Sequence, residues 1–596
     1  MGPIIRVIGF VLLVVTIIGS WRYSFGFDFA NPQWWLWLLD QFKHPLAKVP
    51  NEILYPVYYG LGVFAVVMGI SAWADRRASS SLVGSDRNTR DLHGSAKWAT
   101  AKDVKRSGLM SDQGVVVGGW RKRGSVRALR HDGPEHVFCF APTRSGKGVG
   151  LVIPTLLSWP ESALVLDIKG ENYALSAGWR AAQGQRVFRF DPAAVSGSAK
   201  YNPLEEVRIG TDYEIADCQN IAIMIIDPDG AGLKDFWQEE GYAWLSTAIL
   251  HVLYRIKLQE KRTATLADVR QFMSIGDDES VGQTIRELAE KPSNGEEDDS
   301  FDRLLRDMDA FDHAGRKIVN DEVRIGAARM RKRSSNERSG VHSTGTSQLA
   351  LYSDPIVSNN ISASDFRIAD LMNAEQPTTL YIVIPPSDIA RLRPLVRILL
   401  NQFLTRLTSH MAFEGGRSVK HYKHRMLLML DEFTSVGKLE IFEKSIAFMG
   451  GYGLKAFIIV QDLTQLQKAY GREQSIVSNC HVRIAYAPNT LETARLLSDM
   501  AGKTTIIQKR TSASWRTDQL GASHSESLAE ISRPLLTPDE CMALPGLQKK
   551  ANGSISKAGD MLIFQAGHSP IYGRQLLYFQ DKDLLARAQM VPPKAA

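Results

Sequence analysis

The sequence predicts an α/β fold in which buried strands end in polar loops along one edge of a sheet. One observation is the loop Ala141–Gly148 (Ala-Pro-Thr-Arg-Ser-Gly-Lys-Gly), which lies between the apolar runs His136–Phe140 and Val149–Ile153. Another is the stretch Met426–Glu432, in which five apolar residues are followed by two acids. Because open α/β sheets bind their ligands where the parallel strands end, we expect both loops to meet at one site.

The loop at 141–148 is interpreted as a phosphate-binding P-loop, because it connects a strand to a helix as that motif requires. Lys147 would reach the β and γ phosphates of ATP, on which backbone N–H groups also converge. Two positions depart from the usual motif: Ala141 replaces the first glycine, and Gly148 replaces the hydroxyl residue that ligates magnesium. By itself the loop also fits an ordinary glycine-rich turn. The residues expected to contact the nucleotide are Thr143, Arg144, Ser145, Gly146, Lys147, Gly148 and Val149.

The acidic end of the second motif supplies groups that a nucleotide site needs. Asp431 is expected to hold the Mg²⁺ shell, because this ion prefers oxygen ligands. Glu432 is expected to orient or polarise the attacking water. The alternative is a core strand that ends in a solvated acidic turn, but the presence of both motifs favours a nucleotide site.

Length and charge limit the classes of protein that the chain fits. With 596 residues it is too long for one core, and roughly two to four domains are expected. The net charge of +7 fits contact with nucleic acid or anionic lipid, although basic soluble enzymes are common. The four cysteines lack the spacing of metal ligands, and no Ser/His/Asp or HExxH pattern rises above chance.

Two apolar stretches predict a membrane anchor at residues 1–75. Ile4–Trp21 is apolar apart from Arg6 and two hydroxyl residues, and Ile53–Ala74 is uncharged and long enough to cross about 30 Å of hydrocarbon. The first stretch also fits a signal peptide, because Arg6 precedes a short apolar core, but no Ala-x-Ala-like cleavage site follows closely. We therefore expect two transmembrane helices.

The basic residues predict the orientation of these helices. Eight arginines and lysines lie between 76 and 106, whereas the loop at 22–52 has three. The larger positive cluster stays in the cytoplasm, so both termini are expected to be cytoplasmic. The tryptophans at 34, 35 and 37 suit the membrane interface or a partner, and interface anchoring is the simpler role.

Residues 76–204 are predicted to form the first part of the nucleotide-binding domain. Besides the P-loop strand, runs rich in β-branched residues predict strands at Gly114–Gly118, Ala163–Leu166 and Arg186–Phe190. Asp167 follows one of these strands, and it either borders the nucleotide site or caps the next helix.

Residues 205–365 are predicted to form a separate all-α domain, inserted between the two nucleotide motifs. The basic residues between Arg316 and Arg338 form either a solvated helix face or a surface that contacts DNA or another substrate. Helical patterns occur at Tyr213–Ile226, Phe236–Leu258, Thr265–Met273, Gly282–Glu290 and Phe301–Ser334.

Residues 366–596 are predicted to form the second part of the nucleotide-binding domain and the C-terminal tail. Gln461 lies near the end of the apolar run Lys455–Asp462, and it either senses the γ phosphate or caps the next helix. Residues 510–533, rich in serine, are predicted to be a flexible loop. Further strands are predicted at Thr379–Ile384, His481–Ala487 and Arg574–Phe579, and helices at Leu395–Leu407 and Asn489–Met500.

Beyond about residue 90, the sequence resembles the coupling proteins of type IV secretion systems, membrane ATPases that recruit substrates to conjugation and effector-secretion channels. Six or more motifs occur in the order of that family, which makes the match specific. The blocks that carry it are His93–Ala99, Ala141–Gly150 with Val152–Leu157, Asp167–Tyr173, Tyr201–Leu204, Leu430–Phe433, Gly451–Gly453 with Gln461–Leu466, and Arg533–Pro538.

The resemblance implies a RecA-like motor domain, a membrane-distal all-α domain, and a homo-hexamer on a bacterial inner membrane. Its implied substrate is ATP with Mg²⁺, and its implied partners are inner-membrane channel components, lipid, and either a relaxase with single-stranded DNA or effector proteins. Ring ATPases often donate an arginine to the neighbouring site, for which Arg483 and Arg144 are candidates. Gly148 is usual in one branch of the family, and it leaves more of the magnesium shell to Asp431 and water.

Three other functions fit parts of the same sequence. A receptor for protein effectors would belong to the same family. A non-translocating membrane scaffold with a degenerate nucleotide site is suggested by Ala141 and Gly148, but Lys147, Asp431 and Glu432 argue against it. A septal chromosome translocase would usually have more membrane spans and a C-terminal winged-helix domain.

Overall fold

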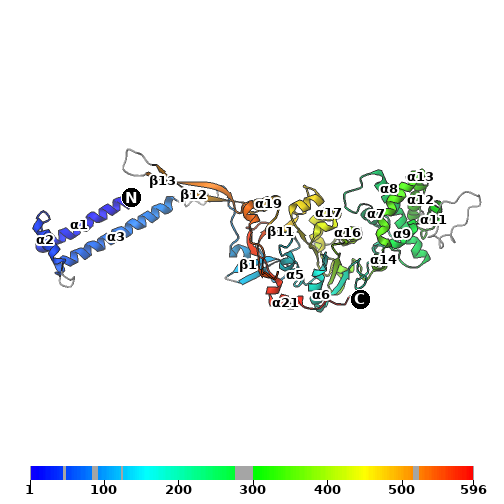
Figure 1. Ribbon diagram of the computed structural model, residues 1–596, viewed down its shortest axis with the longest axis horizontal. Helices are drawn as coiled ribbons and strands as arrows, with labels where there is room; N and C mark the ends of the chain where they lie inside the picture. Colours follow the sequence, from blue (N-terminus) through cyan, green and yellow to red (C-terminus); the bar gives the residue numbers. More distant parts are fainter. Residues whose placement is uncertain are drawn as a thin grey trace, which may run out of the picture. The chain divides into compact units, whose positions relative to one another are not determined.

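A computed structural model describes residues 2–43, 49–82, 92–122, 125–274, 300–514 and 523–594 (Figure 1). The chain divides into two compact units. The first comprises Met1–Ser95 with Thr505–Ser532, and the second comprises Ala96–Thr504 with Arg533–Ala596.

Two long helices of the first unit lie side by side. They are joined through a shorter helix, and the three are α1 (Gly2–Phe25), α2 (Pro32–Gln41) and α3 (Asn51–Leu82). Glycines allow the close approach: a Cβ added to Gly9 would lie 2.9 Å from Val67, and one added to Gly60 would lie 2.8 Å from Ile17. The sequence therefore favours a tightly packed helix pair at this point.

Aromatic residues fill the region where the chain passes from α1 to α3. The Nε1–H of Trp21 donates a hydrogen bond to the carbonyl of Ile53 at 3.0 Å. Phe27 is buried, and its ring contacts those of Trp21, Trp34 and Trp35 at centroid distances of 5.2 to 6.0 Å. Of the three tryptophans predicted for the membrane interface, Trp34 packs against this small core, whereas Trp35 and Trp37 are exposed.

One stretch among the described residues, Asn51–Gly69, is long and apolar enough to cross a membrane. The apolar part of α1, Gly9–Phe25, is shorter than a membrane span requires by the same measure. The structure thus supplies one candidate span, where the sequence predicts two.

A two-stranded sheet of β12 (Lys503–Ser514) and β13 (Ser523–Pro534) stands where a flexible loop was predicted at 510–533, so that prediction was wrong. The serine content was misleading because an exposed ribbon needs no long apolar run. Ile506 and Ile507 are 38% and 51% exposed. The backbone N–H of Thr505 donates to the carbonyl of Gly94 at 3.1 Å, which adds a third segment to the ribbon.

The second unit is built around an 11-stranded mixed sheet in the order β2-β1-β17-β16-β11-β3-β10-β9-β4-β6-β5. The strands from β11 to β5 in that order are parallel, and the other four extend the sheet by antiparallel pairing. The strands are β1 (Val115–Lys122), β2 (Ser125–His131), β3 (His136–Phe140), β4 (Ser162–Asp167), β5 (Arg186–Phe190), β6 (Thr378–Val383), β9 (Met426–Leu430), β10 (Leu454–Val460), β11 (Cys480–Ala485), β16 (Asp560–Gln565) and β17 (Ile571–Arg574).

The register of the central strands positions the predicted site. β3, which leads into the P-loop, and β9, which ends before Asp431, both pair in parallel with β10. Phe140 lies opposite Val460, and Leu430 lies opposite Ile458. The loops after these three strands therefore leave the sheet at the same edge, as the sequence predicts.

The antiparallel extension was largely missed. β2 and β16 were not predicted, because β2 buries few side chains and β16 follows glycine-rich turns. The predicted strand Arg574–Phe579 was wrong: β17 ends at Arg574, and a helical turn, η8 (Tyr578–Gln580), follows.

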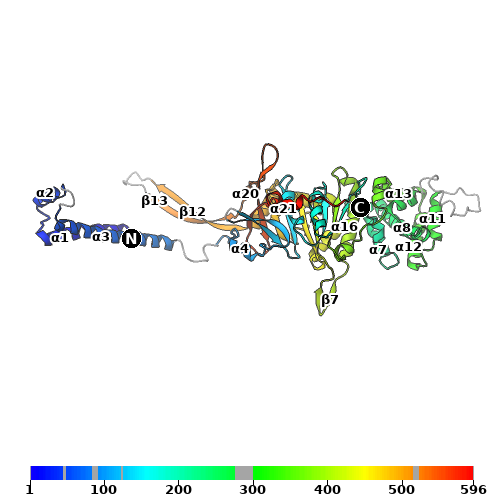
Figure 2. The same cartoon turned by 90° about the horizontal axis from the view of Figure 1, so that it is seen from below.

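Helices cover the faces of the sheet, and small hairpins extend from it; one of them, β7–β8, projects from the body in Figure 2. The helices are α4 (Ala101–Arg106), η2 (Gly148–Val152), α5 (Ile153–Leu156), α6 (Glu171–Ala182), η3 (Pro203–Glu206), α15 (Asp370–Asn373), α16 (Ile389–Leu407), η6 (Phe433–Val436), α17 (Glu440–Met449), η7 (Gly450–Tyr452), α18 (Leu463–Tyr470), α19 (Leu491–Ala501), α20 (Pro538–Met542) and α21 (Lys582–Ala588). The hairpin strands are β7 (Ala412–Glu414), β8 (Arg417–Val419), β14 (Gln548–Lys549) and β15 (Ile555–Lys557).

Between β5 and β6, the described residues of 205–365 form helices and no strand. The predicted helix Gly282–Glu290 lies outside the described residues. The predicted stretch Phe301–Ser334 is two helices, separated by a turn in which Ala314 and Gly315 adopt φ values of +55° and +68° that a continuous helix does not allow. The elements are α7 (Glu214–Ile226), α8 (Phe236–Gln259), α9 (Leu266–Ser274), α11 (Ser300–Ala310), α12 (Lys317–Arg331), α13 (Ser335–Ser347), η5 (Gln348–Ser353) and α14 (Pro355–Asn360).

Most arginines of the predicted basic segment are paired with acids of neighbouring helices. Arg329 and Arg333 both contact Glu240 of α8, and Arg331 contacts Asp309 of α11. These ion pairs neutralise the arginine charges within the helical region. They favour the interpretation of the basic segment as a solvated helix face over that of a DNA-contacting surface.

Arg180 of α6 forms hydrogen bonds both to strand β6 and to the segment before β4. It is fully buried, and its Nε donates to Thr379 Oγ1 at 2.6 Å. Its Nη atoms donate to the carbonyls of Leu156, Trp159 and Glu161 at 2.6 to 3.0 Å. Burial lowers the pKa of Arg180 to about 10, so the side chain stays charged at neutral pH.

Arg180→Met should lower the free energy of unfolding by about 3 kcal/mol or more, because the buried acceptors lose their donors. The measurement is denaturant unfolding followed by tryptophan fluorescence. Arg186→Met, at an exposed position of β5, is the matched control and should change stability little. Equal stability of the two variants would contradict the assigned role of Arg180.

Candidate nucleotide-binding site

The loop after β3 has the backbone geometry of an anion-binding turn. The N–H of Ala141 donates to the carbonyl of Val460 at 2.8 Å, which fixes the loop against β10. Arg144 and Gly146 then adopt φ values of +63° and +93°, and a helical segment follows from Gly148. Alternation of backbone conformations of this kind turns successive N–H groups towards one point.

The two departures from the usual motif have a structural explanation. Ala141 is buried and lies outside the left-handed region, so the first position does not need the freedom of glycine. A Cβ added to Gly148 would meet no atom within 4 Å. The position of the usual hydroxyl residue is therefore open, and nothing in the described chain replaces that side chain there.

Lys147 joins the two predicted motifs. Its Nζ donates to Glu432 Oε1 at 2.5 Å and to the Asp431 carbonyl at 2.8 Å, and it lies 3.3 Å from Asp431 Oδ1. Burial opposes the charge of the ammonium, but the Asp431 and Glu432 carboxylates outweigh it and raise the pKa of Lys147. A positive charge is thus held permanently between the P-loop and the acidic strand end.

Two buried oxygen atoms of these motifs accept no hydrogen bond. They are Ser145 Oγ and Asp431 Oδ1, and the latter has only its ion pair with Lys147 at 3.3 Å. Buried oxygens with unused acceptor capacity are costly, and a carboxylate oxygen in this position suits a divalent cation or its water shell. Together with the turn at Arg144 and Gly146, they show that these residues fit a nucleoside triphosphate with Mg²⁺.

Asp167 caps a helix beside the site. Its Oδ2 accepts a hydrogen bond from the backbone N–H of Tyr173 in α6 at 2.8 Å. Burial raises the pKa of Asp167, and the nearby charge of Asp431 adds to the rise. Both interpretations of this residue are therefore partly right, since the cap lies within electrostatic reach of the acidic pair.

Gln461 follows β10, the strand between β3 and β9, and is half-buried. The cap of α18 is Asp462, whose Oδ1 accepts from the N–H of Gln465 at 2.8 Å. Gln461 is therefore placed at the site edge without serving as that cap.

The two candidate arginines lie apart from the lysine–carboxylate cluster. Arg483 pairs with Phe138 in mid-sheet, and its guanidinium donates back to the carbonyls of Val477 and Ser478 at 3.0 and 3.4 Å. Arg144 is exposed in the P-loop. A role for either one at a neighbouring subunit's site stays a prediction.

Gln575, which was not predicted from the sequence, is hydrogen-bonded to the backbone of the P-loop. It is 3% exposed, and its Nε2–H donates to the Ser145 carbonyl at 3.0 Å. Leu547 packs against the same turn, and a Cβ on Gly146 would lie 2.4 Å from it. Both contacts come from more than 400 residues along the chain, and no local pattern marks them.

The strand, loop and helix around Lys147, with the acids after β9, define an α/β P-loop nucleotide-binding protein. The family model for type IV secretory system conjugative DNA transfer matches residues 97–595, so the chain belongs to that family.

Two curated relatives illustrate the similarity. A conjugal transfer protein TraG of Escherichia coli is 44% identical over 573 residues, which cover 92% of this chain and 86% of the relative. Protein VirD4 of Agrobacterium fabrum is 27% identical over 517 residues, which cover 85% of this chain and 68% of the relative.

Solved structures of the bacterial conjugative coupling protein TrwB share the fold. The trigonal form in complex with sulphate has a TM-score of 0.55 at 15% identity and covers 81% of this chain and 94% of that one. TrwB in complex with ADP and Mg²⁺ has a TM-score of 0.52 at 14% identity, with the same coverage.

Gln575→Ala should weaken binding of a fluorescent ATP analogue about fivefold, because the Ser145 carbonyl loses the donor that orients the loop. Gln565→Ala is the matched control, since Gln565 is a buried glutamine of β16 that donates to the Ser107 carbonyl instead. Equilibrium titration measures both affinities, and thermal melting confirms that both variants are folded. Equal weakening in the two variants would contradict a specific role for Gln575.

Proposed function

We propose that the chain is an inner-membrane ATPase that couples DNA substrates to a conjugative type IV secretion channel. The observation that carries the proposal is the contact of Lys147 with Asp431 and Glu432, which places a P-loop lysine and two acids at one sheet edge. Family membership and the TraG and VirD4 relatives support the coupling role in DNA transfer. TrwB, solved with ADP and Mg²⁺ and with a non-hydrolysable ATP analogue, supports ATP as the substrate.

The residues of this chain would divide the chemistry among them. Lys147 would exchange its carboxylate partner for the β and γ phosphate oxygens, while the backbone of 143–149 surrounds the phosphates. Glu432, once released, would orient the attacking water, and Gln461 would respond to the γ phosphate. Asp431 would hold Mg²⁺ with water ligands, and that ion would neutralise phosphate charge when bound.

The larger architecture is part of the same proposal. The sheet of the second unit would be a RecA-like motor, and the helices at 205–365 would form an all-α domain that receives the relaxase with its DNA. The ring would be a homo-hexamer in which Arg483 or Arg144 serves the neighbouring site. Channel components of the inner membrane would be the remaining partners.

The membrane anchor would consist of both α1 and α3, with both termini cytoplasmic. At 1.5 Å per residue, the apolar stretches Gly9–Phe25 and Asn51–Gly69 extend about 26 and 29 Å, close to the hydrocarbon thickness of about 30 Å. Side-by-side packing through Gly9 and Gly60 supports an antiparallel pair of spans.

Two alternatives are less well supported. A receptor for protein effectors would share the fold, but the family model and relatives concern conjugative DNA transfer. A scaffold without nucleotide turnover would not need Lys147, Asp431 and Glu432 to meet.

Glu432→Gln should retain binding of ATP and lose at least about 100-fold in turnover, because an amide cannot accept the water's proton. Lys147→Ala is the comparison variant and should lose ATP binding as well. Phosphate release and nucleotide titration, made on membrane-inserted protein, separate the two effects. Unchanged turnover in Glu432→Gln would remove Glu432 from the catalytic role.

Deletion of residues 1–75 should release the protein from membranes and weaken its self-association. The physical reason is that two apolar helices hold the subunits in one plane and at high local concentration. Membrane flotation and sedimentation velocity measure the two effects. A hexamer of undiminished stability would show that assembly does not depend on the anchor.

A further inference from the structure

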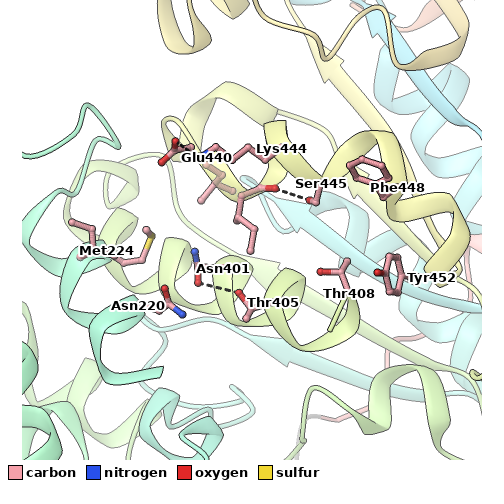
Figure 3. A pocket seen from close by; sticks show the side chains of 13 residues that line it. Asn220, Met224, Asn401, Thr405, Thr408, Glu440, Lys444, Ser445, Phe448 and Tyr452 are labelled. Carbon is pink, nitrogen blue, oxygen red and sulfur yellow. Dashed lines mark hydrogen bonds and ion pairs between the residues drawn. The ribbon is translucent and has the colours of Figure 1, made fainter. Parts of the chain in front are cut away.

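A groove of about 590 Å³ lies on the second unit, between α7, α16 and the segment that contains α17 and η7 (Figure 3). Figure 3 shows Phe448 and Tyr452 at one end of the groove, and Asn220 and Met224 at the other. Asn401 and Thr405 of α16 form part of its wall. Aromatic faces, amides and hydroxyls therefore line one continuous concave surface.

Phe448 and Tyr452 form the aromatic end of the groove. Phe448 is 67% exposed, although it is a large apolar residue on a helix. Tyr452 stands in the turn Gly450–Gly453, where Gly453 has φ of +78° and a Cβ would lie 2.4 Å from the Tyr422 ring. This turn requires glycine, and it presents the tyrosine at the groove.

The charge of the lining is close to balanced. Lys444 pairs with Glu440 at 2.7 Å, and their side chains are 73% and 66% exposed. A pair this exposed contributes little to stability, so Lys444 can turn to a phosphate. The His421 ring lies 6.2 Å from that of Tyr452, and the Lys420 ammonium lies over the Tyr422 ring, so a further cationic residue borders the aromatic end.

The groove belongs to the connection between the two strands that lead to the site. Residues 433–453 link β9, which ends before Glu432, to β10, which ends before Gln461. The N–H and hydroxyl of Ser435 donate to the Glu432 carbonyl at 3.0 and 2.6 Å. The N–H of Leu439 donates to Tyr470 Oη, at the end of α18, at 3.2 Å. Glu432 and α18, which follows Gln461, are therefore both hydrogen-bonded to the segment that carries Phe448 and Tyr452.

We propose that this groove binds a segment of single-stranded DNA, with bases stacked on Phe448 and Tyr452 and a backbone phosphate near Lys444. The inference rests on the proposed function and assigns a DNA-binding site to the second unit. The Phe448 ring is exposed and the Tyr452 ring is partly exposed, and such rings favour bases because every base has a stacking face, whatever the sequence. Amides and hydroxyls in the wall can bond base edges, and Lys420 borders the aromatic end, where a backbone would leave the groove.

The test uses the full chain in detergent and measures the affinity for a fluorescent single-stranded oligonucleotide by anisotropy. Phe448→Ala and Tyr452→Ala should each weaken binding about fivefold or more, because each removes one stacking partner. Phe413→Ala is the matched control: Phe413 is 68% exposed, lies on β7, and does not line the groove. Its substitution should change affinity less than twofold.

A second set of variants tests the charge. Lys444→Ala should reduce the slope of log affinity against log salt by about 0.7, as expected for one lost phosphate contact on a single strand. Glu440→Gln should raise affinity, because it frees Lys444 and removes a negative charge, and a misfolded variant would not show such a gain. A fall in affinity for Glu440→Gln would overturn the phosphate contact.

The outcomes separate this inference from the proposed function. If the parent binds ATP and DNA but both aromatic variants bind DNA as the parent does, the groove is overturned and the coupling ATPase stands. If the variants keep DNA binding and lose binding of a purified relaxase, the groove is a protein site and the inference is also overturned. If the parent binds neither ATP nor DNA, the proposed function itself fails.

Photocrosslinking of an iodouracil oligonucleotide should label Phe448 or Tyr452, and labelling confined to other elements would contradict the proposal.

Discussion

The structure depends on one electrostatic contact, in which a partly buried lysine is kept charged by two carboxylates from a distant segment. Lys147 lies 284 residues before Asp431, and their meeting requires β3, β10 and β9 to be neighbours in parallel register. If β9 were shifted by one residue, Asp431 and Glu432 would exchange faces of the sheet. The order of the central strands is therefore the condition for having a site at all.

Much of that arrangement could be predicted from the sequence, because the signals are local. β3, β9 and β10 are short apolar runs bounded by polar loops. The predicted bounds of β3 match the structure, and those of β9 and β10 differ by one or two residues. The loop at 141–148 and the acids at 431 and 432 could be recognised by residue type and order alone. Asp167 shows the limit of such reasoning, since capping and proximity to the site were posed as alternatives and the fold combines them.

The missed features are those that arise from contacts between distant segments. Gln575 is an isolated amide after a short strand, and only the folded sheet brings its side chain to the Ser145 carbonyl. The ribbon of β12 and β13 was missed for a different reason, because prediction from apolar periodicity fails where neither face is fully buried. The break between α11 and α12 follows from the backbone of Ala314, and alanine usually favours a helix.

The groove proposed for DNA differs from the basic surface that the net charge alone would suggest. The arginines at 329, 331 and 333 pair with acids of the same region, whereas the groove beside α17 is nearly neutral. This difference has a physical consequence for a motor that must grip and release a strand in every cycle. Coulomb attraction to a basic surface extends over about 8 Å at physiological salt, so a small movement of the surface barely changes it.

Stacking on an aromatic ring, in contrast, acts only at contact, and a gap of about 1 Å forfeits a large part of the attraction. A strand held by Phe448 and Tyr452 would therefore be gripped or released by a small displacement of α17. The segment of α17 is hydrogen-bonded to the Glu432 carbonyl at one end and leads into β10 at the other, so a change at the site would act on it from both ends. A near-neutral aromatic groove is thus better matched to a nucleotide-driven cycle than a strongly basic channel wall would be.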